Sequence, residues 1–133
     1  MKKKVLFASI LLVLLALLTA LAVSCGKRAV IYKDTDQVQP GVYKFGKKIT
    51  FIYKPLRENV VSVALTGDFN NWNTSGLPLT KLDDYWTITI NLEYGIYQYN
   101  FVLDGKDIVP DHHAEAYAPD GKGGKNSIVE VSR

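Results

Sequence analysis

Apolar residues recur at every second position through much of the chain after residue 46. This alternation is typical of β-strands that bury one face and expose the other. The runs that show it are residues 49–53, 61–65, 86–92, 97–103 and 128–131. No segment after residue 24 places apolar side chains at helical spacing over three turns. We therefore expect six or seven short strands in this part of the chain.

Turn-forming residues separate these runs. Pro55 ends the first run, and Gly67 follows the second. The pair Asp104-Gly105 is typical of a tight hairpin, because both central positions of such a turn need a positive φ. Short strands with turn signals between them predict an all-β fold, an immunoglobulin-like (early-set) β-sandwich of two packed sheets.

The two tryptophans are expected to have different roles. Trp86 is in phase with Ile88 and Ile90, which predicts a place in the core. Trp72 lies instead among asparagines and other turn formers, which favour an exposed position. An exposed indole there is available as a flat platform for stacking. The alternative is that Trp72 folds back as a lid over the end of the sandwich.

The first 25 residues have the layout of an export signal. Three lysines at positions 2–4 precede the uncharged run Val5 to Ser24, which ends in small residues directly before Cys25. A basic start, an apolar run and small residues at its exit describe a secretory signal. A cysteine at this point is similar to a bacterial lipoprotein cleavage site. We predict a lipoprotein signal peptide at 1–24 and a lipidated Cys25 with a tether at 25–45.

Two other interpretations of this N-terminus remain open. The apolar run approaches the ~20 residues that span a bilayer, so it is also compatible with an uncleaved anchor helix. Cys25 is the only cysteine, so it forms no intramolecular disulfide, and an incidental cysteine is the other interpretation. With either anchor, the lysines favour placing the domain at 46–133 outside the cytoplasm, at the cell membrane or the outer membrane.

The charge balance argues against nucleic acid as a partner. The formal net charge of the whole chain is +3, and Lys2, Lys3 and Lys4 account for all of it. The remainder therefore carries equal numbers of cationic and anionic residues. Such a balance predicts no basic face that follows a phosphate backbone.

Two motifs in the domain resemble a known family. The first is Gly67-Asp68-Phe69-Asn70-Asn71-Trp72, and the second is the aromatic strand from Ile96 to Leu103 with its Asp104-Gly105 turn. Together they are similar to carbohydrate-binding module family 48, which includes the glycogen-binding domain of the AMP-activated protein kinase β subunit. The resemblance covers roughly residues 46–133 and implies the same sandwich fold, with a non-catalytic role in binding α-glucan.

The resemblance also implies particular sugar contacts. Trp72 matches the family's aromatic platform, and Asn126 matches an asparagine before the last strand. Asn100 stands where the family has a lysine, and we include it as a third candidate contact. Lys122 stands where the family has a leucine. The second tryptophan platform, two residues after the turn, is Asp107 here, so we expect a weak site.

Other candidate chemistry is poorly supported. His112-His113 have no further His or Cys in the domain to complete a metal site. The glycine-rich stretch 121–126 does not have the pattern of a phosphate loop. Asp83-Asp84 is typical of a solvated turn. We expect no metal, no cofactor and no enzyme activity.

The sequence thus predicts a membrane-tethered module that binds glycogen, starch or maltooligosaccharide. An alternative function remains open. In it, an envelope lipoprotein uses the same sandwich to bind a protein partner or for a structural role, and the sugar site is lost.

Overall fold

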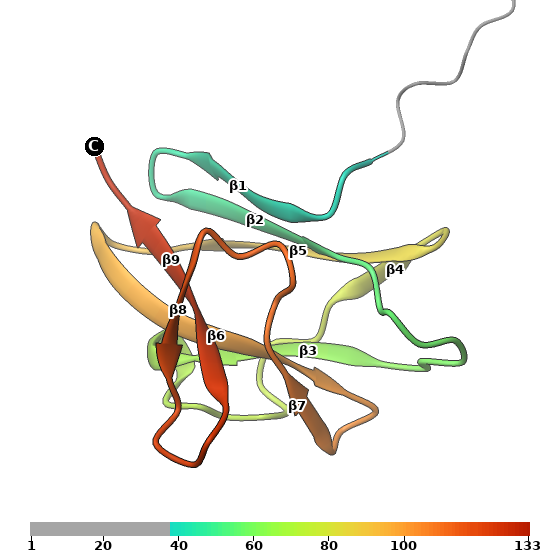
Figure 1. Ribbon diagram of the computed structural model, residues 1–133. Helices are drawn as coiled ribbons and strands as arrows, with labels where there is room; N and C mark the ends of the chain where they lie inside the picture. The colour runs from blue at the N-terminus through green and yellow to red at the C-terminus, as the bar shows by residue number, and fades with distance from the viewer. Residues whose placement is uncertain (1–37) are drawn as a thin grey trace, which may run out of the picture. The chain divides into compact units, whose positions relative to one another are not determined.

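The computed structural model describes residues 38–133, which form one compact unit of nine strands and one 3-10 turn (Figure 1). The elements are β1 (Gly41–Phe45), β2 (Lys48–Tyr53), β3 (Val63–Gly67), η1 (Asp68–Asn70), β4 (Thr80–Leu82), β5 (Tyr85–Asn91), β6 (Gly95–Leu103), β7 (Asp107–Val109), β8 (Ala116–Pro119) and β9 (Lys125–Val131). The predicted signal peptide and Cys25 lie outside the described residues. Within 38–133, no helix has the length and apolar character needed to cross a membrane.

The strands form two antiparallel sheets that pack face to face (Figure 1). The first sheet has the order β1-β2-β5-β4, and the second has the order β3-β6-β9-β8. The short strand β7 pairs with the second half of β6, next to the start of β9. This arrangement confirms the all-β sandwich that the alternating pattern predicts.

The core lies between the sheets and is rich in aromatic side chains. Phe51 meets Tyr99 with ring centroids 5.0 Å apart in an edge-to-face arrangement, and Tyr53 meets Phe101 at 4.2 Å. Trp86 is only 7% exposed, as its phase with the neighbouring isoleucines predicts. The inward positions of β2, β5 and β6 thus bury the apolar face that the sequence shows.

Two expectations about strand bounds were wrong. Strand β1 falls inside the stretch 25–45 that we assigned to the tether, because Val42 packs against the core and Gly46 (φ 57°) turns the chain back into β2. Val61 is 79% exposed, and β3 begins only at Val63. The reason is that the Val61 and Ser62 N–H groups donate to the Asp104 carboxylate instead of joining the sheet.

The predicted hairpin at Asp104-Gly105 is present. Both residues have positive φ, at 53° and 72°, and the Lys106 N–H donates to the Leu103 carbonyl at 3.1 Å. The turn sends the chain from β6 directly into β7, so residues that follow it lie beside the middle of the second sheet.

Candidate functional site

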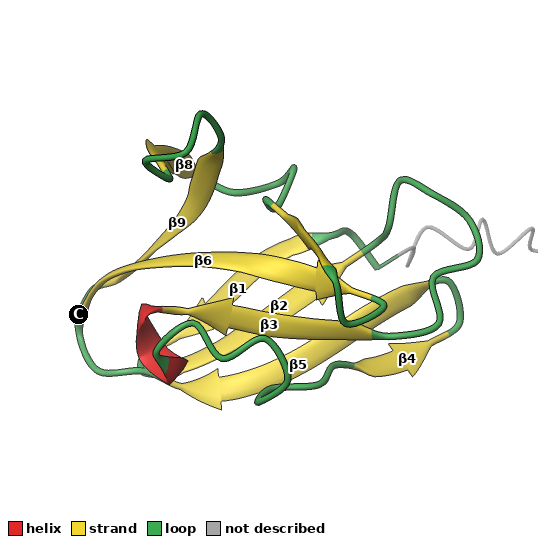
Figure 2. Ribbon diagram, turned by 90° about the horizontal axis from the view of Figure 1, so that it is seen from below, coloured by secondary structure: helices red, strands yellow, loops and turns green. Residues whose placement is uncertain are grey.

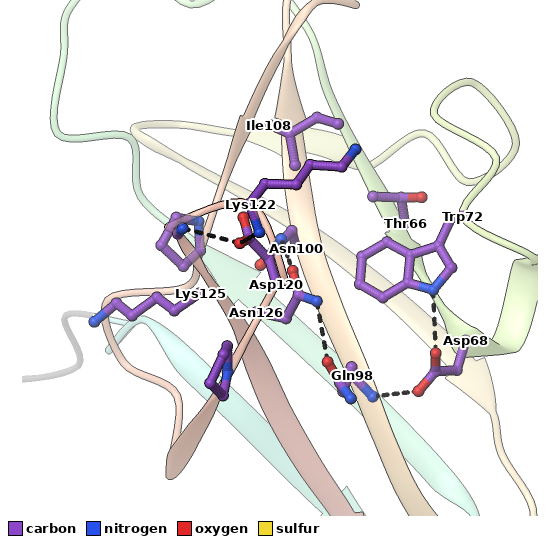
Figure 3. A pocket seen from close by; sticks show the side chains of 13 residues that line it. Thr66, Asp68, Trp72, Gln98, Asn100, Ile108, Asp120, Lys122, Lys125 and Asn126 are labelled. Atoms are coloured by element: carbon purple, nitrogen blue, oxygen red, sulfur yellow. Dashed lines mark hydrogen bonds between the residues drawn. The ribbon is translucent and has the colours of Figure 1, made fainter.

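A groove of about 690 Å³ lies on the outer side of the second sheet (Figure 3). Its lining comes from β3, η1 and the turn after it, β6, β7 and the β8–β9 hairpin. These segments are far apart in the sequence but meet because β6 lies between β3 and the other strands. Trp72, Asn100 and Asn126, the three contacts that the sequence predicts, all line this groove.

The turn that carries Trp72 is built by its neighbours in the motif. A Cβ on Gly67 would lie 2.4 Å from the Gln98 carbonyl oxygen, so only glycine fits this close approach to β6. The Asn70 side chain accepts from the Gly67 N–H and donates to the carbonyls of Leu65 and Asn73. Phe69 packs against the core. Figure 2 draws η1 in red at the end of β3.

Trp72 is presented at the groove in a conformation unusual for a large side chain. Its φ is 58°, and that of Asn71 is 54°, both in the left-handed region. The Trp72 N–H donates to the Gly67 carbonyl at 2.9 Å, which closes the turn. The residue remains 36% exposed, so part of its ring is open to the groove.

The floor of the groove carries a chain of amide side chains. Asn100 Nδ2 donates to Asn126 Oδ1 at 2.7 Å, and Asn126 Nδ2 donates to Gln98 Oε1 at 3.0 Å (Figure 3). Asn100 Oδ1 also accepts the Ser127 N–H at 3.3 Å. An amide nitrogen has two hydrogens. Within the described residues, Asn100 and Asn126 thus each donate one amide hydrogen. The second hydrogen of each amide is available for a ligand.

Thr66 lies next to this amide chain. It pairs directly with Asn100 across β3 and β6, so its side chain points to the same face of the sheet. Thr66 is fully buried, and its Oγ1 has no hydrogen-bond partner among the described residues. Buried polar groups of this kind are rare, because each one carries a desolvation cost.

The far wall of the groove corrects one of our sequence assignments. Asp107, which we placed at the second platform, is not among the lining residues; its carboxylate lies 3.1 Å from the Arg57 guanidinium. Ile108 lines the groove instead, with 54% of its surface exposed. Successive side chains of a strand point to opposite faces, so a shift of one residue moves the wall position from Asp107 to Ile108.

The β8–β9 hairpin closes the groove from the side. Asp120 accepts the backbone N–H groups of Lys122 and Gly124 at 2.7 and 2.9 Å, and these hydrogen bonds hold the pKa of its carboxyl below the usual value. The Lys122 side chain reaches across toward Ile108 (Figure 3). With Asp68 and Lys125, the lining holds two acidic and two basic residues, so the groove has no excess of either charge.

Other candidate groups lie elsewhere. His112 and His113 are exposed, and the structure shows no group of three or more possible metal ligands within residues 38–133. Asp84 pairs with Lys54 on the surface. The glycine-rich stretch forms the β8–β9 turn and the start of β9.

Sequence reasoning missed several groove residues, among them Gln98, Thr66 and Asp68. Gln98 shares its strand face with Asn100 two positions later, so the alternation contained a signal for it. Thr66 lies in a strand, two residues before Asp68, and nothing in the sequence distinguishes it from an ordinary strand threonine. Nothing in the local sequence indicates that Asp68 bonds to a residue 30 positions away.

Comparison with known proteins identifies the family. Residues 53–133 match the family described as the glycogen recognition site of AMP-activated protein kinase. The chain belongs to this family of carbohydrate-binding modules. The match includes the Trp72 turn, the whole of β6 and the β8–β9 hairpin, and thus the elements that line the groove.

Individual relatives agree with this assignment. The chain is 34% identical over 71 residues to the 5'-AMP-activated protein kinase subunit beta-1 of Sus scrofa, covering 53% of this chain and 55% of that one. It is 41% identical over 61 residues to a 1,4-alpha-glucan branching enzyme of Bacillus caldolyticus, covering 42% of this chain and 9% of the enzyme. A 1,4-alpha-glucan-branching enzyme of Emericella nidulans is 34% identical over 76 residues, covering 47% of this chain and 11% of the enzyme.

A solved structure supports the fold. The maltogenic amylase of S. marinus superposes with a TM-score of 0.51 at 18% identity, over 70% of this chain and 15% of the amylase. The chain thus spans only about half of the kinase subunit and about a tenth of the branching enzymes.

Proposed function

We propose that this chain is a non-catalytic module that binds α-glucan, such as glycogen, starch or maltooligosaccharide, in the groove beside Trp72. The observation that carries the proposal is the pairing of an exposed indole with a floor of amide donors. An indole face stacks on the apolar face of a glucose ring. Amide N–H groups donate to its hydroxyls.

The expected affinity is low. Covering one face of an indole hides on the order of 100 Å², or about 2.5 kcal/mol gross. Two or three hydrogen bonds add about 0.5–1.5 kcal/mol each. Against several kcal/mol of association cost, this leaves roughly millimolar affinity or weaker. Ile108 offers less contact area than a second aromatic ring, so it does not change this order of magnitude.

Electrophoresis of the full-length protein in polysaccharide gels tests the proposal. Amylose is expected to retard the wild-type protein and cellulose is not, because α-1,4 chains curve around one projecting ring while flat β-1,4 chains favour a row of rings. Trp72→Ala is expected to abolish retardation. Phe45→Ala is a matched control, since Phe45 is 86% exposed on β1, in the other sheet. An amylose mobility equal to that in plain gel would contradict the proposal.

The second part of the proposal concerns location. A lipid on Cys25 would tether the module to the cell membrane or the outer membrane, outside the cytoplasm, with two or more acyl chains for stable attachment. Mass spectrometry of the protein from membranes is expected to find an acylated Cys25 as the first residue, and Cys25→Ser is expected to leave the precursor uncleaved. An intact Met1 in the wild-type protein would favour the anchor helix.

The alternative function is an envelope protein that binds another protein. It is favoured by the outer face of β1, where Phe45 and Tyr43 are exposed beside each other at alternate positions. Retention of a partner by the wild-type protein but not by Phe45→Ala, with no retardation in amylose, would support this second role.

A further inference from the structure

Asp68 joins the Trp72 side chain to strand β6 of the sheet beneath it. One carboxylate oxygen, Oδ1, accepts the indole N–H of Trp72 at 3.1 Å. The other, Oδ2, accepts the backbone N–H of Gln98 in β6 at 2.7 Å (Figure 3). A carboxylate that accepts two N–H groups in this way forms charge-assisted bonds, which are stronger than neutral ones.

Trp72 depends on this bond for the direction of its ring. The indole has one polar atom, and its N–H is a donor only. The backbone at Trp72 is held by the Gly67 carbonyl, but that bond leaves the side-chain torsions free. Within the described residues, Asp68 is the group that hydrogen-bonds the ring itself.

The same carboxylate connects the ring to the amide floor. The Gln98 backbone is bound to Asp68, and the Gln98 side chain accepts from Asn126, which in turn accepts from Asn100. Gln98 therefore links the two sets of hydrogen bonds: its backbone N–H binds the carboxylate that holds the indole, and its side chain binds the amides. Ring and floor are held in one relative geometry before any ligand arrives.

We propose that Asp68 is the positioning residue of the groove: it fixes the plane of the Trp72 ring relative to the amide donors, so that a glucose unit meets both at once. This inference rests on the proposed function. Ordering a side chain at an interface weakens binding by the entropy that is lost. A ring already held by Asp68 avoids much of this loss, so removing the bond is expected to weaken binding without removing any ligand contact.

Asp68→Asn in the full-length protein tests the role. The amide keeps one acceptor oxygen and places an NH2 group opposite either the indole or Gln98. The chain has two tryptophans, so a ¹H–¹⁵N spectrum contains two indole N–H signals, and that of the buried Trp86 is an internal reference. The Trp72 signal is expected to shift upfield and to exchange faster with water, while the Trp86 signal stays in place.

Binding is measured on the same samples, by titration with maltoheptaose at a temperature where both variants are folded. Asp68→Asn is expected to bind about two- to tenfold more weakly, which corresponds to the ordering of one side chain. Glu130→Gln is the matched control, because it removes one negative charge at an exposed position of β9 and is expected to change neither measurement.

The outcomes separate the two proposals. An unchanged Trp72 signal in Asp68→Asn would contradict the hydrogen bond between Asp68 and the indole, and a shifted signal with unchanged affinity would overturn the positioning role. If the wild-type protein binds no maltoheptaose or amylose, the proposed function fails and the positioning role with it, whereas the indole signal still reports whether Asp68 holds the ring.

Discussion

Asp107 and Ile108 are neighbours in β7, and their side chains point to opposite faces of the sheet. The carboxylate of Asp107 pairs with Arg57 at 3.1 Å, while Ile108 is exposed in the groove. This relationship determines the position at which a second aromatic side chain would face the groove. That position is residue 108.

Ile108→Trp is therefore expected to strengthen α-glucan binding by ~1–2 kcal/mol, or about five- to thirtyfold, through one more stacked face less the lost side-chain freedom. Asp107→Trp is expected to leave binding unchanged, because its ring would lie on the Arg57 side. Titration with maltoheptaose measures both. A gain from Asp107→Trp with none from Ile108→Trp would contradict the assignment of the wall.

Trp72 and Phe101 are expected to differ in their importance for stability. Trp72→Ala removes a partly exposed ring outside the core and is expected to lower the free energy of unfolding only slightly. Phe101→Ala leaves a cavity beside Tyr53 and Tyr99 and is expected to cost about 3–5 kcal/mol. Urea unfolding of the two variants tests this. Equal losses would mean that Trp72 contributes to the core as a lid.

The parts of the fold that sequence predicted are those with long alternation. Residues 86–92 and 97–103 contain enough positions to show which face is buried. Strands β4, β7 and β8 have only three or four residues, too few for a period of two to stand out. Strand β1 was missed because its core contact is Val42, while Tyr43 and Phe45 point outward.

The candidate site was predicted where a side chain follows from a local motif. The Trp72 turn contains its own glycine and asparagine, so its exposure can be inferred from six residues. The hydrogen bond between Asp68 and Gln98 depends on how η1 lies against β6, which no local pattern contains. At β7, an error of one residue exchanged Ile108 for Asp107 and reversed the face.

Tyr99 is expected to make the protein less stable in alkali. Burial, the Asp111 charge and the hydrogen bond to Asp111 raise the pKa of the Tyr99 hydroxyl above its usual value of 10.0. Above about pH 10 the unfolded chain loses this proton while the folded protein keeps it. The free energy of unfolding therefore falls as pH rises, by up to ~1.4 kcal/mol per pH unit from this group.

Tyr99→Phe removes this dependence. Its free energy of unfolding is expected to fall less steeply above pH 10 than that of the wild-type protein, although it is lower at neutral pH because buried Asp111 loses a donor. Urea unfolding between pH 7 and 11 gives both values. Tyr94→Phe, at an exposed ring, is the control and is expected to keep the wild-type slope. Identical slopes for Tyr99→Phe and the wild type would refute the assignment.

Thr66 provides the last prediction, because its buried hydroxyl has no partner among the described residues. Valine has nearly the same shape and no polar atom, so Thr66→Val is expected to raise the free energy of unfolding by roughly 1 kcal/mol through the desolvation cost that it removes. For a domain of this size, that corresponds to a rise of about 4–8 °C in the thermal midpoint. Thr66→Ser keeps the hydroxyl and loses a methyl group, so it is expected to be less stable than the wild-type protein. A lower midpoint for Thr66→Val would instead mean that a bound water pairs with the hydroxyl, and that the floor of the groove is hydrated in the free protein.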